Sequence, residues 1–183
     1  MEKKKSAEAL LQEAYLKLLT KKSYLEVSVT DLVKEAGVAR VSYYRLFDSF
    51  DDLVEKILDN VFKILTDNVF PQIEKMSDET WQQTIERLFY KFKKNEYPFS
   101  LPKLLPQNLN YICSKAEEKI TNANFNGGKK SRKYIFAVNA SIVIALAKTW
   151  ALNGFKESER DLSNLAVKLV KNNIDAVKEF SIG

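Results

Sequence analysis

The chain has 183 residues, a length that suits one domain or two small ones. It is 45% hydrophobic and 29% charged, which supports a packed core and argues against a disordered chain. With 5 glycines and 4 prolines, turn residues are too scarce for a sheet-rich fold, so we expect an all-α protein. Histidine is absent and Cys113 is the single cysteine, which excludes histidine-based catalysis, an intrachain disulfide and a cysteine-rich zinc site. The net charge of +5 permits nucleic-acid binding without requiring it.

Capping residues, glycines and prolines divide the chain into about nine predicted helices and no strand. Ser28 and Asp31 form a capping box that opens one helix, and Gly37 ends it. A second capping box at Ser49 opens a long helix that Pro71 closes. The expected helices cover residues 6–21, 28–37, 40–47, 49–71, 78–95, a short or irregular segment between the prolines of 98–106, 107–124, 129–153 with Gly154 as its cap, and 158–180.

The most apolar stretch, residues 134–152, approaches the length of a membrane span. It contains Asn139 and Lys148, which are costly in lipid, so we expect a helix buried in protein instead. The N-terminus lacks the apolar region of a secretory signal. These features predict a cytoplasmic protein with no membrane association.

The most informative segment is residues 28–47, where two short helices are joined by a corner at residues 36–39 that contains Gly37. Such a tight corner allows the second helix of a helix-turn-helix to enter the major groove of DNA. A tight helical hairpin in an ordinary α-domain is the alternative that the pattern leaves open. With the preceding helix, the motif predicts a three-helix domain over residues 1–50 and a second helical domain over residues 51–183.

The amino-acid sequence of this segment resembles that of the tetracycline-repressor (TetR) family of bacterial regulators. The resemblance covers about residues 9–58 and includes Asp31, the turn at residues 36–38, Tyr44, Phe47 and the acidic start of the next helix. It implies an all-α homodimer in which the helix-turn-helix domain is joined to a C-terminal domain for effector binding and dimerisation. The implied function is a transcriptional repressor that a small apolar or aromatic effector releases from a palindromic operator. We expect no enzyme activity and no cofactor or metal, because the sequence contains no nucleophile–base pair, phosphate loop or metal cluster.

Arg40 and Arg45 are the expected readers of DNA sequence, because the guanidinium fork matches the acceptor atoms of guanine. Tyr44 matches the tyrosine with which the family contacts a phosphate. Solvated surface cations and a core aromatic are the alternatives for these side chains. The residues expected at the DNA are Ser28, Thr30, Arg40, Ser42, Tyr43, Tyr44 and Arg45.

Three positions depart from the family. Phe50 stands where many members hold a phosphate with lysine, Tyr43 stands where a buried leucine is usual, and Val33 stands where alanine is usual. Residues 1–50 carry nine basic and seven acidic side chains, so local placement of charge has to provide the affinity for DNA. The departures keep a second hypothesis open, in which a TetR-like protein acts as an activator or through a protein partner without sensing a small molecule.

The last two predicted helices carry apolar faces that we expect to form the dimer interface, with an intramolecular core as the alternative. The expected interface residues are Tyr134, Val138, Ile142, Ala145, Thr149, Leu165 and Leu169. The last helix has one apolar stripe, made of Leu162, Leu165, Ala166, Leu169, Val170, Ile174 and Val177.

The middle of the chain is rich in aromatic side chains, which either form a core or line the effector pocket that the resemblance implies. The expected pocket residues are Trp81, Phe89, Phe92, Tyr111 and Asn139. The other polar groups expected inside are Gln107, Asn110 and Cys113.

Overall fold

The computed structural model describes residues 5–68, 77–94, 103–122 and 130–179, and every regular element in these ranges is helical. This confirms the all-α prediction. The short or irregular helix expected among the prolines falls largely on residues 95–102, outside the described ranges. The helices are α1 (Ala7–Leu18), α2 (Val29–Ala36), α3 (Arg40–Leu46), α4 (Phe50–Asn68), α5 (Asp78–Lys93), α6 (Pro106–Asn122), α7 (Lys130–Leu152) and α8 (Glu159–Glu179), with a 3₁₀ turn at Tyr24–Glu26.

Local capping signals begin and end these helices as predicted. The Ser28 hydroxyl accepts a hydrogen bond from the Asp31 amide at 3.1 Å, and the Asp31 carboxylate accepts one from the Ser28 amide at 3.1 Å. Gly37 ends α2 at a φ of +66°, a left-handed conformation that a side chain disfavours. Gly154 follows α7 at a φ of +75°. The predicted closure of the long helix at Pro71 lies outside the described residues.

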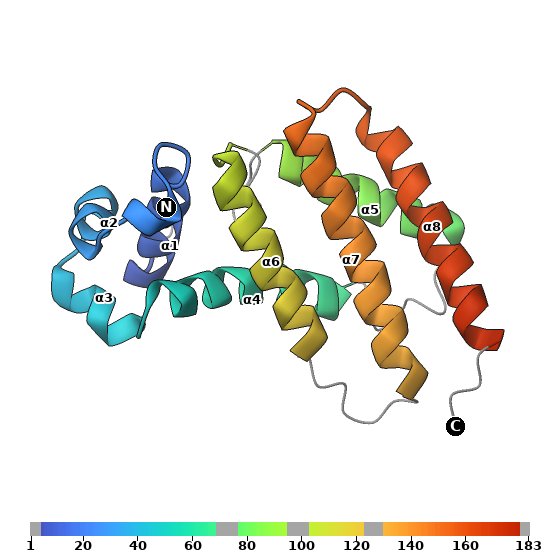
Figure 1. The fold of residues 1–183 in the computed structure, drawn as a ribbon, viewed down its shortest axis with the longest axis horizontal. Coiled ribbons are helices and arrows are strands. Elements are labelled where there is room, and N and C mark those ends of the chain that lie inside the picture. Colours follow the sequence, from blue (N-terminus) through green and yellow to red (C-terminus); the bar gives the residue numbers. More distant parts are fainter. Residues whose placement is uncertain (1–4, 69–76, 95–102, 123–129, 180–183) are drawn as a thin grey trace.

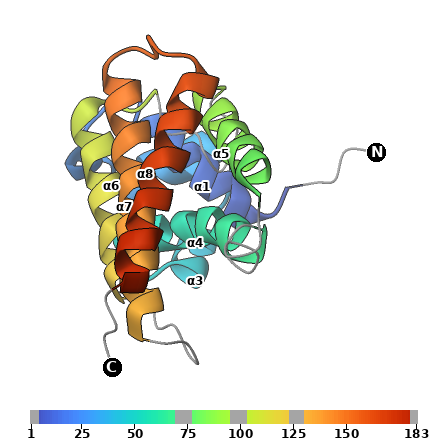
Figure 2. The same cartoon turned by 90° about the vertical axis from the view of Figure 1, so that its right-hand side faces the viewer.

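The helices form two groups that α4 connects (Figure 1). Helices α1–α3 lie at one end of the molecule, and α5, α7 and α8 lie at the other, with α6 between them. The turned view shows α6, α7 and α8 side by side (Figure 2). None of the helices in the described ranges is both long enough and apolar enough to span a membrane.

Two main hydrophobic cores correspond to these groups. The core of the N-terminal group extends beyond α1–α3, because it includes Leu53 and Ile57 of α4 and Leu109 of α6. A boundary between two domains at residue 50 therefore stays a prediction, since the buried side chains on its two sides belong to one core. The second core joins α5, α7 and α8, with Trp150 and Phe89 among its largest buried side chains.

The apolar stripe predicted for the last helix divides into two faces. Leu162, Ala166 and Val170 are buried against the rest of the chain. Leu165 and Leu169 are 44% and 37% exposed on the other face. The side chains of Ile174 and Val177 lie outside the part of the chain that the structure describes.

Asn108 is the buried polar residue at the start of α6, which corrects the expectation that Gln107 and Asn110 point inward. Both of those neighbours are exposed. The Asn108 amide donates to the backbone carbonyls of Leu19 at 2.7 Å and Lys22 at 2.8 Å, and its oxygen accepts from the Tyr24 amide at 2.8 Å. These hydrogen bonds satisfy backbone groups in the segment that follows α1, where no long helix supplies partners.

We predict that Asn108→Ala lowers the free energy of unfolding by about 3 kcal/mol, because it removes the side-chain partner of the Tyr24 amide and the Lys22 carbonyl and one of the two hydrogen bonds to the Leu19 carbonyl. Urea denaturation followed by circular dichroism measures this change. Asn110→Ala is the matched control, since the same side chain is removed from an exposed position on the same helix. Equal midpoints for the two variants would contradict the role assigned to Asn108.

Candidate functional site

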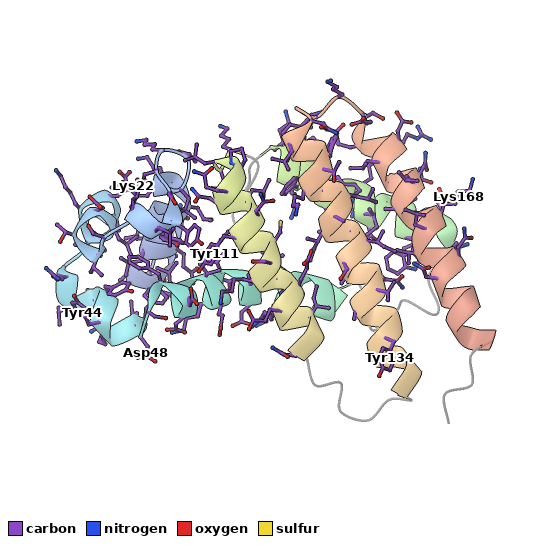
Figure 3. All side chains as sticks on the ribbon, viewed as in Figure 1. Lys22, Tyr44, Asp48, Tyr111, Tyr134 and Lys168 are labelled. Atoms are coloured by element: carbon purple, nitrogen blue, oxygen red, sulfur yellow. The ribbon has the colours of Figure 1, made fainter. Side chains whose placement is uncertain are left out.

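Helix α3 presents a partly cationic surface at the free end of the N-terminal group, and it also exposes the apolar side chain of Val41. Arg40, Tyr44 and Arg45 are exposed on it, and Ser42 is half-buried. Figure 3 shows Tyr44 at the tip of the molecule, far from α8. The exposure of Tyr44 decides against the alternative that it is a core aromatic.

Arg40 and Tyr44 contact each other across one turn of α3. The guanidinium donates to the phenol oxygen of Tyr44 from Nη2 at 3.0 Å and from Nε at 3.3 Å, and its carbon lies 5.7 Å from the ring centroid. Arg45 forms no hydrogen bond or ion pair with the other described residues. The two arginines therefore differ: Arg40 is held in place by its neighbour, whereas Arg45 is available to a partner.

Lys56 of α4 supports the C-terminal end of α3, a contact that sequence reasoning did not identify. Its ammonium donates to the Leu46 carbonyl, lies 3.3 Å from the Asp52 carboxylate and sits 4.9 Å from the Phe47 ring centroid. A cation at a helix C-terminus satisfies an orphan carbonyl and complements the helix dipole. The spacing of Asp52 and Lys56 on one helix face is the sequence signal that could have identified it.

Tyr43 is a core residue, which corrects the prediction that it contacts DNA. Only 3% of it is exposed, because this side of α3 packs onto the domain. Its ring centroid lies 5.6 Å from that of Phe50 and 5.8 Å from that of Phe47, and Phe50 stacks on Tyr15 with centroids 5.3 Å apart. Val33 packs against the same core, so the three departures from the family pattern all enlarge or cover it.

The start of α2 is held by charge as well as by its cap. Asp31 forms an ion pair with Lys22 at 2.9 Å and accepts a hydrogen bond from the Ser28 hydroxyl at 2.7 Å. These hydrogen bonds, with that of Ser28 the strongest cause, lower the pKa of Asp31 to about 2. The Ser28 hydroxyl is thus occupied within its own cap, whereas Thr30 beside it is exposed.

The outward face of α7 and α8 carries the residues predicted for dimerisation. Tyr134 is 58% exposed, and Val138, Leu165 and Leu169 are also large exposed hydrophobic side chains. Ala145 and Thr149 are exposed and Ile142 is half-buried. Figure 3 shows Tyr134 near the lower end of α7, well separated from Tyr44.

A cavity of about 140 Å³ lies in the C-terminal body, between α4, α5, α6 and α7 with Val170 of α8. Four of the five residues predicted for the pocket line it, namely Trp81, Phe89, Phe92 and Asn139.

Tyr111 is the exception, because it faces the N-terminal helices instead of the cavity (Figure 3). Its ring stacks on Tyr24 with centroids 4.0 Å apart and planes within 1°, and its hydroxyl donates to Asp51. Lys115, one turn further along α6, pairs with the same carboxylate at 2.9 Å. Tyr111 is therefore a contact between α6 and the N-terminal group.

These features define an all-α helix-turn-helix protein with a helical body that contains a cavity. Residues 10–57 match the family model described as bacterial regulatory proteins, tetR family. An uncharacterised HTH-type transcriptional regulator of Haemophilus influenzae is 34% identical over 59 residues, which are 32% of this chain and 29% of that relative. The similarity thus spans less than a third of the curated relative.

The similarity of fold to solved structures covers most of the chain. A TetR transcriptional regulator from Streptococcus agalactiae 2603V has 17% identity and a TM-score of 0.57, covering 90% of this chain and 93% of that one. The dihydroxyacetone kinase operon activator DhaS has 19% identity and a TM-score of 0.51, covering 93% of this chain and 97% of that one. Residues 10–57 therefore match the DNA-binding region of the TetR family, and the fold of the chain resembles that of TetR regulators.

We predict that Asp31 makes the stability of the protein sensitive to acid. Its pKa is about 2 in the folded protein against an ordinary value of 3.8, so the ionised group stabilises the fold above about pH 4. This contribution is lost as the pH falls from about 4 to about 2. Urea midpoints measured across this window should fall more steeply for the wild type than for Asp31→Asn.

The control is Asp48→Asn, at an exposed carboxylate that has no hydrogen bond or ion pair with other described side chains. This variant should follow the wild-type curve. Parallel curves for the wild type and Asp31→Asn would show that the cap does not titrate as described.

Proposed function

We propose that the chain is a sequence-specific DNA-binding regulator of transcription that acts as a homodimer. More specifically, we propose that it is a repressor and that a small molecule releases it from a palindromic operator. The observation that supports it best is the surface of α3, where Arg40, Tyr44 and Arg45 are exposed at the free end of a helix-turn-helix.

Each exposed group on α3 has a chemical role in this proposal. Arg45, which has no partner among the described residues, reads a guanine edge with its guanidinium fork. Tyr44 accepts hydrogen bonds from Arg40, so its own O–H is left to donate to a phosphate oxygen. Arg40 has further N–H donors for the same phosphate or for a neighbouring base. In this proposal, the exposed Thr30 at the start of α2 and the half-buried Ser42 of α3 add hydroxyl donors.

The exposed apolar face of α7 and α8 supports the homodimer. Exposed side chains such as Tyr134, Val138 and Leu165 form a surface that a second copy can cover in a four-helix arrangement. Helices α7 and α8 lie away from α3 (Figure 1), so pairing through them leaves both recognition helices free. Two half-sites spaced by whole turns of DNA match such a dimer.

The cavity supports effector binding, and α6 connects it to the DNA-binding end. Ile112, Cys113 and Ala116 of α6 belong to the core of the N-terminal group and also line the cavity. A ligand that binds one position of α6 more tightly than another shifts the balance between the two.

Activation is the second candidate, which the name of DhaS favours, since it describes an operon activator with this fold. Measuring transcription from the bound promoter in cells with and without the protein distinguishes the two, because a repressor lowers transcription and an activator raises it.

We predict that Arg45→Ala and Arg40→Ala each weaken binding to the operator by roughly 1–3 kcal/mol. The measurement is a gel shift or fluorescence anisotropy titration with DNA from beside the protein's own gene, repeated at several salt concentrations. Lys34→Ala is the matched control, because it removes one exposed positive charge from α2 instead of α3.

Measuring the affinity of each variant for random DNA as well distinguishes the two possible roles of each arginine. Loss on the operator alone identifies a reader of bases, and equal loss on both DNAs identifies a phosphate contact. Wild-type binding to the two DNAs with equal affinity would refute sequence-specific recognition.

We predict that Leu165→Lys combined with Leu169→Lys converts the dimer to a monomer, because two ammonium groups from each copy enter the apolar face. Sedimentation velocity over a dilution series measures the change. Tyr90→Lys is the control, at another exposed hydrophobic residue that lies on α5 outside this face. A wild-type chain that stays monomeric, or a double variant that stays dimeric, would contradict the interface.

A further inference from the structure

The cavity in the C-terminal body is lined almost wholly by apolar side chains. Among the lining residues that the structure describes, only Cys113, Asn139 and Lys148 carry a polar group outside an aromatic ring. Such a lining favours an apolar occupant whose orientation is set by very few polar contacts.

Asn139 is the polar group in this lining that lacks a partner. It is 4% exposed, and neither its Oδ1 nor its Nδ2 has a hydrogen-bond partner among the described residues. A buried amide in this state is costly, whereas the great majority of buried polar groups in proteins are paired. A ligand with a hydrogen-bonding group supplies the missing partner.

The size of the cavity limits the ligand to about one ring. Its volume of about 140 Å³ is close to that of an apolar cavity of about 150 Å³ in another protein that binds benzene. Pockets for drug-sized molecules start at roughly 300 Å³.

The other two polar residues of the lining fit such a ligand less well. Lys148 lies nine residues from Asn139 on α7, so the backbone positions of the two residues are about 13.5 Å apart along the helix axis. Burial raises the pKa of the Cys113 thiol to about 11, so it is protonated and unreactive at neutral pH.

We infer that the cavity binds an uncharged, single-ring molecule with one hydroxyl-type group, and that this group pairs with the Asn139 amide. A hydroxyl is the smallest group that pairs with either atom of the amide, because it both donates and accepts. As a statement about the effector, this inference rests on the proposed function; as a statement about binding, it is tested without DNA.

Phenol and benzene are the matched probes, since they differ by the hydroxyl alone. In a cavity without a polar partner benzene binds better, because phenol loses the hydration of its hydroxyl. With the Asn139 amide as partner, we expect phenol to bind the wild-type chain roughly fivefold more tightly than benzene in calorimetric titrations. In Asn139→Leu, which keeps the branched shape of the side chain, we expect benzene to bind roughly tenfold more tightly than phenol.

The stability of Asn139→Leu is a second readout, independent of any ligand. Replacing an unpartnered buried amide by an apolar side chain should leave the urea midpoint of the free protein equal or higher. A lower midpoint means that the amide already has a structural partner, which overturns the inference.

Three further outcomes overturn it. These are tighter binding of benzene than phenol to the wild type, an unchanged preference for phenol in Asn139→Leu, and tighter binding of benzoate than phenol, which would make Lys148 the polar contact. A gel shift of the operator complex with and without phenol separates this inference from the proposed function. Phenol that binds the cavity without changing the gel shift refutes the effector role and leaves the assigned ligand class in place.

Discussion

The structure depends on the attachment of α6 to the N-terminal helices, and the buried side-chain amide of Asn108 makes that attachment. Its three hydrogen bonds reach backbone groups that lie 84 to 89 residues earlier in the chain. These groups follow the end of α1, where no later turn of helix satisfies them, so groups from elsewhere in the chain do so: the Asn108 side chain reaches all three, and the Leu105 amide also donates to the Leu19 carbonyl at 3.2 Å. Once α6 is anchored there, the stack of Tyr111 on Tyr24 and the pair between Lys115 and Asp51 extend the contact along its first turns. The position of α6 relative to the helix-turn-helix is therefore specified by directional interactions and not by apolar packing alone.

The same helix forms one wall of the cavity, and this shared use connects the two ends of the molecule. Side chains such as Ile112 and Ala116 belong to the core beneath α1–α4 and also border the cavity. These side chains join the lining of the cavity to the core of the N-terminal group, and a close-packed core transmits a displacement instead of absorbing it. In the proposed function, this places α6 between the effector and the core against which the recognition helix packs. Coupling then requires only that α6 has two positions with different affinities for the ligand.

Features decided within a few residues could be predicted from the sequence, whereas features decided by distant contacts could not. The cap at Ser28 and the left-handed residue Gly37 follow from side chains and backbone conformations within one turn, and the structure has both. Among the polar residues that open α6, the sequence favoured Gln107 and Asn110, yet Asn108 is the one that faces the carbonyls after α1. Helical periodicity cannot make this choice, because it depends on where α1 ends in space. For the same reason the apolar stripe of α8 was visible as a whole, while its division into a buried and an exposed face required the positions of α5 and α7.

The departures from the family pattern around α3, which look independent in the sequence, form one aromatic cluster in the structure. Tyr43 occupies the space of a usual leucine, and Phe50 covers it while stacking on Tyr15. The larger buried side chain and the apolar residue at the start of α4 therefore support each other. The consequence is electrostatic: the position where many family members carry a phosphate-binding lysine has no charge here. Since the salt dependence of DNA binding scales with the number of phosphates neutralised, a domain of this kind depends less on its overall field. In the proposed function, its affinity comes from the few groups that α3 exposes, so Arg40 and Arg45 carry more of it than they do in a more cationic relative.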